Sequence, residues 1–434
     1  MKNYINKFYL LKLTLAASLL LSFSSCKKEY VDPNAALADD VLTTSRGLTG
    51  VAVGLQRLYT AGRAGVYFNS VSANGFVTNE IYLVNSGNIP ELQLFTGGSS
   101  VDGTNAILTG LWTNANKIIF DADNVIRNAA NLADKDYAAG LIAYTSIFKA
   151  LAIGNLSQYW EKIPSGIGQN VSFITRQEGF TKAIKVIDDA LAGVNGKAIN
   201  PALLSNIPAG IDIKNTLNAL KARYALFMGS YVLALSAANS VDLTVKSSFN
   251  FDNNTFNPIY DIATSTANVF QPTNAALGLT GTAVPDADDK RIPFYTAAAA
   301  TAPFARLKGF GAALTMAIPV YLPGEITLIK AEVLARQPDT EAALAELNKV
   351  VTKDPATAVF GVGAGLPALT GTYNQAELLA LIYKHRCIEL YLSGLKIEDM
   401  RRFGLANSER KRNFFPYPFT ERDGNPNTPA DPVF

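Results

Sequence analysis

Residues 324–356, GEITLIKAEVLARQPDTEAALAELNKVVTKDPA, carry the pattern of two short helices in succession. Apolar residues recur at helical spacing in both halves: Leu322, Ile326, Ile329 and Val333 in and just before the first, and Ala343, Leu347 and Val350 in the second. Pro338 lies between the halves and prevents one continuous helix, because it lacks an N–H group and its ring collides with the preceding turn. Asp339 and Glu341 then place negative charge at the start of the second helix, where free N–H groups favour it. The stretch therefore predicts a helical hairpin.

Four residues of this hairpin match the small, small, large and proline positions of the tetratricopeptide repeat, a helix pair of about 34 residues: Ala331, Ala343, Leu347 and Pro355. Small residues let two helix backbones approach, and the large residue fills the gap between them. One such pair cannot bury its own apolar face, so the match predicts stacked neighbouring helices. An ordinary helical hairpin remains the alternative.

The chain begins with a pattern typical of a bacterial secretory signal, residues 1–25. Basic residues precede an apolar core, residues 13–21, which is too short to span a bilayer as a lasting anchor. Small residues then precede Cys26, which resembles the lipobox of bacterial lipoproteins, although Phe23 stands where Leu is usual. The resemblance implies that Cys26 is lipidated and that residues 26–40 form a flexible tether. A plain secretory signal with an incidental cysteine is the alternative.

Composition limits the function classes that remain. The chain has 38 Lys and Arg against 36 Asp and Glu, and three of those lysines lie in the leader, so the mature chain is close to neutral. A near-neutral chain argues against nucleic-acid binding. Cys387 is the only cysteine after Cys26, which excludes an intramolecular disulfide. One thiol and one histidine, His385, cannot form a Cys/His zinc site, and we expect neither a metal nor a cofactor.

The rest of the chain reads as helices interrupted by two long polar segments. Apolar spacing predicts helices over residues 44–61, 111–132, 136–160, 175–193, 213–238 and 374–393, in addition to the hairpin. Residues 62–105 and 240–318 are rich in Gly, Asn, Ser and Thr with scattered aromatics, and we expect long loop insertions there. No strand–helix alternation is visible, which disfavours a parallel α/β fold. We predict one mainly α domain over residues 41–434, with a proline-rich tail from Phe414.

Six stretches follow one another in an order that is informative: LWTNANKIIFDADNVI (111–126), YTSIFKALAIGNLSQYWEKIP (144–164), DADDKRIPFYT (286–296), EITLIKAEVLAR (325–336), RCIELYLSGLKIEDMRRFG (386–404) and FFPYPFTERDGNPNTP (414–429). Together they resemble the SusD/RagB family of outer-membrane nutrient-binding lipoproteins. In the fifth stretch Arg386, Glu389, Gly394 and Asp399 match the family motif, whereas Ser393 stands where Glu is usual.

This resemblance implies a right-handed superhelix of tetratricopeptide-like helix pairs that supports an irregular ligand-binding region. It also implies a location on the outer membrane, lipid-anchored and facing the cell exterior, and a partner, a TonB-dependent SusC-like transporter barrel that the protein covers as a hinged lid. Ligands in the family are mostly oligosaccharides and sometimes peptides. A tetratricopeptide-type interaction lipoprotein that faces the periplasm is the alternative of another class.

Catalytic chemistry is not expected. The sole histidine, His385, falls on the apolar face of the last predicted helix, where packing or a structural hydrogen bond is the favoured role. Charged residues around the same helix are expected to form structural ion pairs, Glu389 with Arg386, and Asp399 with Arg401 and Arg402. The glycines of residues 97–110 lack the Lys-Ser/Thr pair of a phosphate-binding loop.

Sugar binding requires flat apolar surfaces together with amide, carboxylate and hydroxyl groups, because one hydrogen bond in water contributes only about 1 kcal/mol. Residues 62–105 supply this mixture, and the candidate ligand-binding residues are Asn74, Asn79, Glu80, Tyr82, Asn85, Asn88 and Phe95, with Tyr295 as a weaker one. The alternative is that these aromatics pack the segment onto the body. Trp112 and Trp160 lie in predicted helices and are expected in the core.

Overall fold

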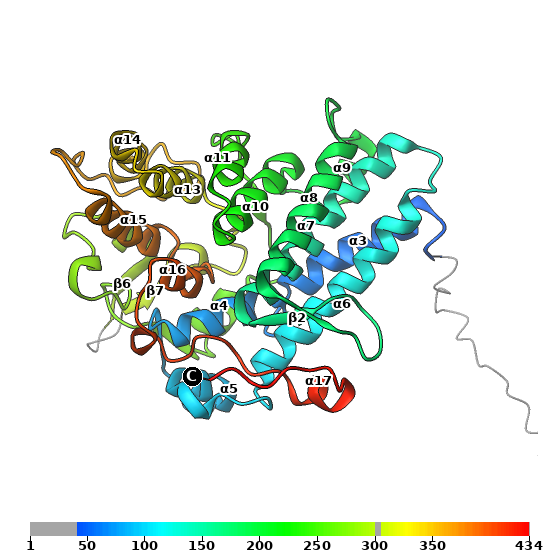
Figure 1. Ribbon diagram of the computed structural model, residues 1–434, viewed down its shortest axis with the longest axis horizontal. Helices are drawn as coiled ribbons and strands as arrows, with labels where there is room; N and C mark the ends of the chain where they lie inside the picture. Colours follow the sequence, from blue (N-terminus) through cyan, green and yellow to red (C-terminus); the bar gives the residue numbers. More distant parts are fainter. Residues whose placement is uncertain (1–40, 300–304, 434) are drawn as a thin grey trace, which may run out of the picture. The chain divides into compact units, whose positions relative to one another are not determined.

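Helices that are neighbours in sequence also pack against one another in space (Figure 1). The computed structural model describes residues 41–299 and 305–433. Each helix of the following series contacts the next: α6 (Ala106–Ala129), α7 (Lys135–Tyr159), α8 (Arg176–Gly193), α10 (Ile213–Phe227), α11 (Tyr231–Asn239), α13 (Pro323–Arg336) and α14 (Thr340–Val351). The predicted mainly α fold class is confirmed, and the right-handed superhelix stays a prediction.

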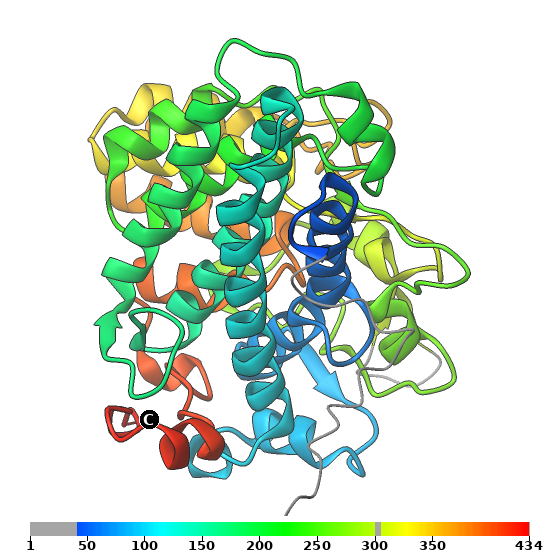
Figure 2. The same cartoon turned by 90° about the vertical axis from the view of Figure 1, so that its right-hand side faces the viewer.

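The two ends of this helical array are formed by different parts of the chain. α15 (Gln375–Glu389) packs on both α13 and α14, and α3 (Ser45–Thr60) packs on α6 and α7. Figure 2 shows α3, in dark blue, beside the upright helix α6. Shorter helices also occur, among them α9 (Pro201–Asn206), α12 (Arg291–Tyr295), α16 (Lys396–Arg402) and α17 (Phe419–Gly424).

Side-chain caps explain where several helices begin. Asn105 accepts hydrogen bonds from the N–H groups of Ile107 and Leu108 at the start of α6. Thr175 with Glu178 forms a reciprocal capping box at the start of α8, and Asn374 with Glu377 does the same for α15. Each cap contributes about 1 kcal/mol, because it satisfies N–H groups that the helix leaves unpaired.

The expectation of a loop over residues 62–105 is wrong for much of that segment. It contains α4 (Val66–Val77), the strand β1 (Ile81–Leu83), α5 (Ile89–Thr96) and a single 3₁₀ turn (Gly98–Ser100). α4 is buried on almost every side, so its sequence shows no apolar stripe. Its hydroxyl groups bond back to the helix, as Ser72 does to the carbonyl of Phe68 at 2.7 Å, and this makes polar residues tolerable inside the protein.

The single helix expected over residues 213–238 is two helices, α10 and α11. Gly229 has a positive φ of 73°, a backbone conformation that residues with a Cβ rarely adopt, and it ends α10. The turn lets α11 fold back along α10, which it contacts. Small apolar residues lie on both sides of the turn, so the apolar spacing of the sequence predicts one helix where there are two.

Short antiparallel strand pairs brace the region between α11 and α13. They are β1 with β5 (Phe270–Pro272), β4 (Ser248–Phe249) with β8 (Ile318–Pro319), and β6 (Thr296–Ala298) with β7 (Ala305–Leu307). A fourth pair joins β2 (Lys162–Pro164) to β3 (Phe173–Thr175) after α7. In the first pair Ile81 lies opposite Pro272 and Leu83 opposite Phe270, so β1 and β5 tie the two long polar segments together.

α7 lies at the centre of the described core. It is the one described helix that is long and apolar enough to cross a membrane, but 83% of its apolar window is buried inside the protein. It is followed directly by Trp160, whose ring meets that of Trp112 on α6 edge-to-face at 4.9 Å between centroids. Both tryptophans are buried, so their predicted place in the core is confirmed.

Buried ion pairs join α13, α15 and α16, and one of the expected pairs is among them, Arg402 with Asp399 at 2.7 Å. Arg386 pairs with Asp399 at 2.9 Å, and Arg402 pairs with Glu332 at 2.6 Å. Burial would raise the pKa of Glu332, but Arg402 and Arg386 outweigh it and lower that pKa to about 2. The expected pair of Glu389 with Arg386 is wrong.

Glu389 instead pairs with Arg291 at 3.2 Å and with Lys353, and Arg401 pairs with Glu398 rather than Asp399. The expected pairs were inferred from sequence spacing, whereas Arg291, Arg386 and Arg402 also reach carboxylates on other elements. The signal segment, Cys26 and the tether to residue 40 lie outside the described residues.

His385 is buried, and it takes part in this network. The Nη2 group of Arg291 lies 2.8 Å from His385 Nδ1, which must accept because a guanidinium only donates. Burial first, and then the charges of Arg291 and Lys384, lower the pKa of His385 from 6.5 to about 2. The expected structural role is therefore consistent with its contacts.

We expect acid to destabilise the protein through this side chain. Below pH 6.5 the histidine takes up a proton in the unfolded chain but not in the folded one. The free energy of unfolding therefore decreases as the pH is lowered, by up to about 1.4 kcal/mol per pH unit. Urea unfolding at pH 7.5 and 5.5 measures this loss, and His385→Asn, which keeps an acceptor for Arg291, should reduce it.

The comparison with the variant is essential, because burial raises the pKa of Glu80 and gives a pH dependence of the opposite sign. An equal loss in both proteins would contradict the assignment, since this is the only histidine in the chain.

Candidate functional site

The strand β1 presents one aromatic side chain outward. Along a strand successive side chains point to opposite faces, and here Ile81 and Leu83 are buried whereas Tyr82 is half-buried. The pairing of β1 with β5 fixes this alternation, because a shift by one residue would bury Tyr82 and expose its two neighbours. The sequence therefore places an aromatic ring where solvent reaches it.

A second ring comes from α5, directly after this strand. Leu94 is buried under the helix, and Phe95 beside it is half-buried. The rings of Tyr82 and Phe95 meet edge-to-face, 5.0 Å apart and at 76°. Phe76 on α4 supports Phe95 from within at 6.4 Å. We call Tyr82 and Phe95 the aromatic pair.

The turn between β1 and α5 brings amide groups to the same segment. Asn85 is exposed and Asn88 is half-buried, and the Nδ2 group of Asn88 donates to the carbonyl of Asn85 at 3.1 Å. Arg63, from the turn after α3, donates to Asn88 Oδ1 at 3.1 Å and also pairs with the buried Glu91. Burial raises the pKa of Glu91, and Arg63 partly offsets that effect. The turn is thus held by side chains and offers amides to solvent.

A lysine that no sequence motif indicates completes this surface. The Nζ atom of Lys411 lies 4.1 Å from the centre of the Phe95 ring. It arrives from a segment far along the chain, after α16, and no motif in the sequence links it to α5. Only the tertiary structure reveals the contact.

Two of the predicted ligand residues, Asn74 and Glu80, are instead buried inside the protein. Asn74 donates to Glu80 Oε2 at 2.6 Å and accepts from the N–H of Ile397 at 2.8 Å. Glu80 Oε1 accepts from the N–H of Leu392 at 3.3 Å. These bonds tie α4 to α16 and to the loop that precedes it, which is a structural role away from solvent.

Asn79 and Tyr295 also have structural contacts. Asn79 has a positive φ of 62°, which asparagine tolerates better than most residues, and its carbonyl accepts from the hydroxyl of Thr273 at 2.6 Å. Tyr295 is buried, and its hydroxyl donates to the carbonyl of Glu389 at 2.7 Å. The structure therefore brings Tyr82, Asn85, Asn88 and Phe95 together near solvent and separates them from the other four candidates.

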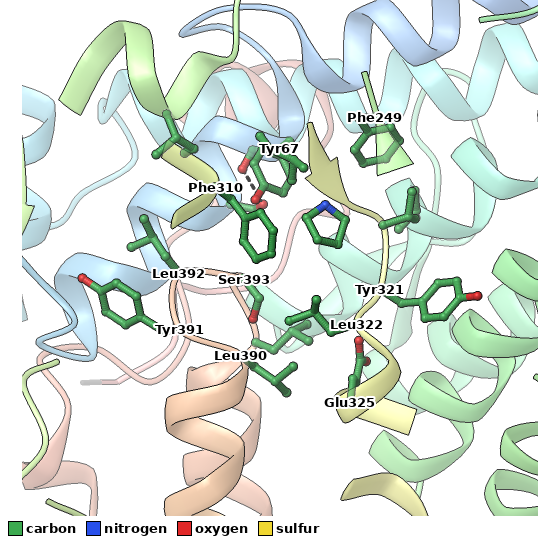
Figure 3. Close-up of a pocket in the computed structure, with 18 of the residues that line it drawn as sticks. Tyr67, Phe249, Phe310, Tyr321, Leu322, Glu325, Leu390, Tyr391, Leu392 and Ser393 are labelled. Atoms are coloured by element: carbon green, nitrogen blue, oxygen red, sulfur yellow. Dashed lines mark hydrogen bonds between the residues drawn. The ribbon is translucent and has the colours of Figure 1, made fainter. Parts of the chain in front are cut away.

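Tyr295 is one wall of an interior cavity of about 80 Å³ (Figure 3). Aromatic side chains from several elements surround it: Tyr59, Tyr67, Tyr224, Phe249, Phe310, Tyr321 and Tyr391. The buried pair of Arg223 and Glu325, at 2.6 Å, forms part of its wall. Sites for drug-sized ligands occupy several hundred Å³, so this cavity is too small for an oligosaccharide.

The loop from Leu390 to Leu395 lines the same cavity and has an unusual backbone. Leu392 has a positive φ of 59° and Gly394 one of 81°, and the conformation is rare for a leucine. The carbonyl of Gly394 accepts hydrogen bonds from Gln158 at 2.5 Å and Tyr159 at 2.7 Å, which holds the loop in this shape. Figure 3 shows Leu392 and Ser393 of this loop at the cavity.

A second hollow, about 450 Å³ and open to solvent, lies between α3 and α6. Small and charged side chains line it, including Gly54, Ala61 and Arg57. The ion pair of Lys117 with Asp121, at 2.8 Å, forms its rim on α6. It contains none of the aromatic rings that a sugar would stack on.

Two features of the described residues bear on whether the protein could bind a metal ion or act through a nucleophile. Within residues 41–299 and 305–433 no three His, Cys, Asp or Glu side chains gather as a metal site would require. The thiol of Cys387 is buried, and burial raises its pKa to about 12, which disfavours the reactive thiolate.

Solved structures of SusD superfamily proteins resemble this structure over most of its length. One from Bacteroides thetaiotaomicron has 16% sequence identity and a TM-score of 0.70, with 90% of this chain and 100% of that one covered. One from Bacteroides vulgatus has 12% identity and a TM-score of 0.70, with 91% and 100% covered. This chain has the SusD fold.

The fold that the six ordered stretches predicted is thus confirmed. A SusD-like carbohydrate binding protein from Bacteroides fragilis is also similar, with 14% identity, a TM-score of 0.65, and 85% of this chain and 88% of that one covered. At the level of sequence, no protein-family model and no curated protein matches the chain. At such identities the SusD fold is shared while individual ligand contacts are not transferable.

We expect Asn74→Ala to destabilise the protein by about 2–4 kcal/mol, because it removes two buried hydrogen bonds, one of them to a carboxylate. Asn85→Ala, on the exposed turn, should change stability by less than about 0.5 kcal/mol. Urea unfolding of both variants measures the difference. Equal stabilities would contradict the structural role of Asn74.

Proposed function

We propose that this protein is a non-catalytic glycan-binding lipoprotein of the outer membrane. In this proposal it captures oligosaccharides at the cell surface and delivers them to a TonB-dependent, SusC-like transporter. The observation that carries the proposal is the SusD fold over about nine tenths of the chain, shared with proteins described as SusD-like carbohydrate binding. The lipobox-like segment that ends at Cys26 supports the membrane anchor.

The aromatic pair is the proposed platform for the sugar. A pyranose ring has an apolar face that stacks on an aromatic ring, and its hydroxyls require polar partners at the edge. Tyr82 and Phe95 offer the rings, and Asn85 and Asn88 on the adjoining turn offer amides. Because each hydrogen bond adds only about 1 kcal/mol in water, the stacking surface and several amides must act together.

The pairing of β1 with β5 supports a preorganised site. The backbone of Tyr82 is fixed opposite Gln271, and the adjoining turn is held by Arg63. A ligand that binds such a surface need not order a loop, so more of the contact energy remains as affinity. The cavity beside Tyr295 is left out of the proposed site, because its volume of about 80 Å³ is well below that of sites for drug-sized ligands.

We expect Tyr82→Ala to weaken oligosaccharide binding by tenfold or more, about 1.4 kcal/mol, since it removes a stacking surface. Calorimetric titration with a glycan selected on an array measures the loss. Phe120→Ala is the matched control, because that ring is 49% exposed on α6, outside the proposed platform. Equal affinities of the two variants, or binding of peptides in place of any glycan, would contradict the proposal.

We also expect Cys26→Ala to release the protein from membranes. The substitution removes the only thiol that the lipobox-like segment offers for lipid attachment. Fractionation of cells that express each form measures the distribution, and surface proteolysis of intact cells tests the outward orientation. Membrane retention of the variant would count against the lipid anchor.

A further inference from the structure

Lys411 is held in place through its backbone rather than its side chain. Its N–H donates to the carbonyl of Val77, the last residue of α4, at 2.8 Å. Its carbonyl accepts from the N–H of Gly98, just after α5, also at 2.8 Å. Residue 411 is therefore fixed between two elements that flank the aromatic pair.

A close backbone approach makes this position possible. Gly97 ends α5 with a positive φ of 76°, and a Cβ added there would overlap the Cβ of Lys411. Only glycine meets both conditions, since it tolerates that backbone conformation and leaves room for the lysine. The approach sets the ammonium of Lys411 over the face of Phe95.

The charge of Lys411 has no acidic partner among the described residues. No carboxylate there lies within ion-pair distance of its Nζ, whereas many other lysines, such as Lys353 and Lys384, do have one. Burial alone lowers the pKa of Lys411 to about 8. The ring of Phe95 offers a cation–π contact, which offsets only part of the cost of partial desolvation.

The ammonium is within reach of the proposed platform. Its Nζ lies 4.1 Å from the centre of Phe95, and the Tyr82 ring lies 5.0 Å from the same centre. The distance from Lys411 Nζ to the centre of the Tyr82 ring is therefore at most the sum of these two distances. That span is comparable to one or two sugar units. An anionic group on a sugar stacked at Tyr82 would meet an ammonium that has no carboxylate partner among the described residues.

We propose that Lys411 makes the site selective for acidic oligosaccharides, whose sugars carry a carboxylate as uronic acids do. This inference rests on the proposed glycan-binding function and adds the class of sugar. A single carboxylate neutralises the charge of this ammonium, and the charge-assisted bond forms in a partly desolvated place where it is stronger than in water. Lys411 is in this sense a specificity-determining residue.

The test compares acidic sugars with neutral forms of the same chain. Trigalacturonate, trimannuronate and sialyllactose are titrated calorimetrically into the mature protein, each beside its methyl ester, which keeps the shape and removes the charge. At least one acid should bind tenfold or more tightly than its ester. Lys411→Met, which keeps the aliphatic stem over Phe95, should abolish that difference, and Lys411→Arg should retain it.

Lys185→Met is the matched control, because it removes one exposed positive charge far along the chain, on α8. It should leave the preference for the acid intact. Thermal unfolding of each variant checks that the fold is kept, and the pKa of Lys411, followed by NMR of the methylated lysine, should rise when the acid binds.

Two results would overturn the inference: glycans bind but acids and esters bind equally, or Lys411→Met keeps the preference. Both outcomes leave the proposed function standing. Failure of every oligosaccharide, neutral or acidic, to bind would instead overturn the proposed function itself.

Discussion

The buried residue Glu80 joins the helical scaffold to the segment that carries the proposed site. Its carboxylate accepts from Asn74 on α4 and from the N–H of Leu392 in the loop after α15. Its carbonyl accepts from the hydroxyl of Tyr391 and from the N–H of Thr273, just after β5. Since Tyr82 follows two residues later, the position of its aromatic ring depends on these hydrogen bonds of Glu80.

Buried ion pairs among α13, α15 and α16 lie next to the loop that Glu80 contacts. Glu332, Arg386, Asp399 and Arg402 are all buried or nearly so, and each carboxylate has at least two arginine partners. Such a network is costly to desolvate but also costly to break, because removal of one member leaves an unpaired charge inside the protein. The network joins α16 to α13 and α15, on either side of the loop whose Leu392 N–H donates to Glu80.

The proposed site and the buried contacts of the fold thus draw on different residues of the same segment. Asn74 and Glu80 face the core, while Tyr82, Asn85 and Phe95 reach solvent. In sequence these residues form one polar–aromatic run, and composition alone could not distinguish the buried residues from those that reach solvent. Helix α4 explains the difficulty: buried on almost all sides, it has no polar face, so its Asn and Ser residues resemble those of a loop.

Local signals in the sequence determined the helical class, the approximate bounds of most of the longer helices and the hairpin after Gly324, because capping residues, proline breaks and apolar spacing act over a few residues. They also determined the order of stretches that indicated the SusD fold. The tertiary structure alone decided which charged residues pair, which asparagines are buried, and that Lys411 meets Phe95. Those contacts join residues distant in sequence, and long side chains choose partners only after the backbone has brought them within reach.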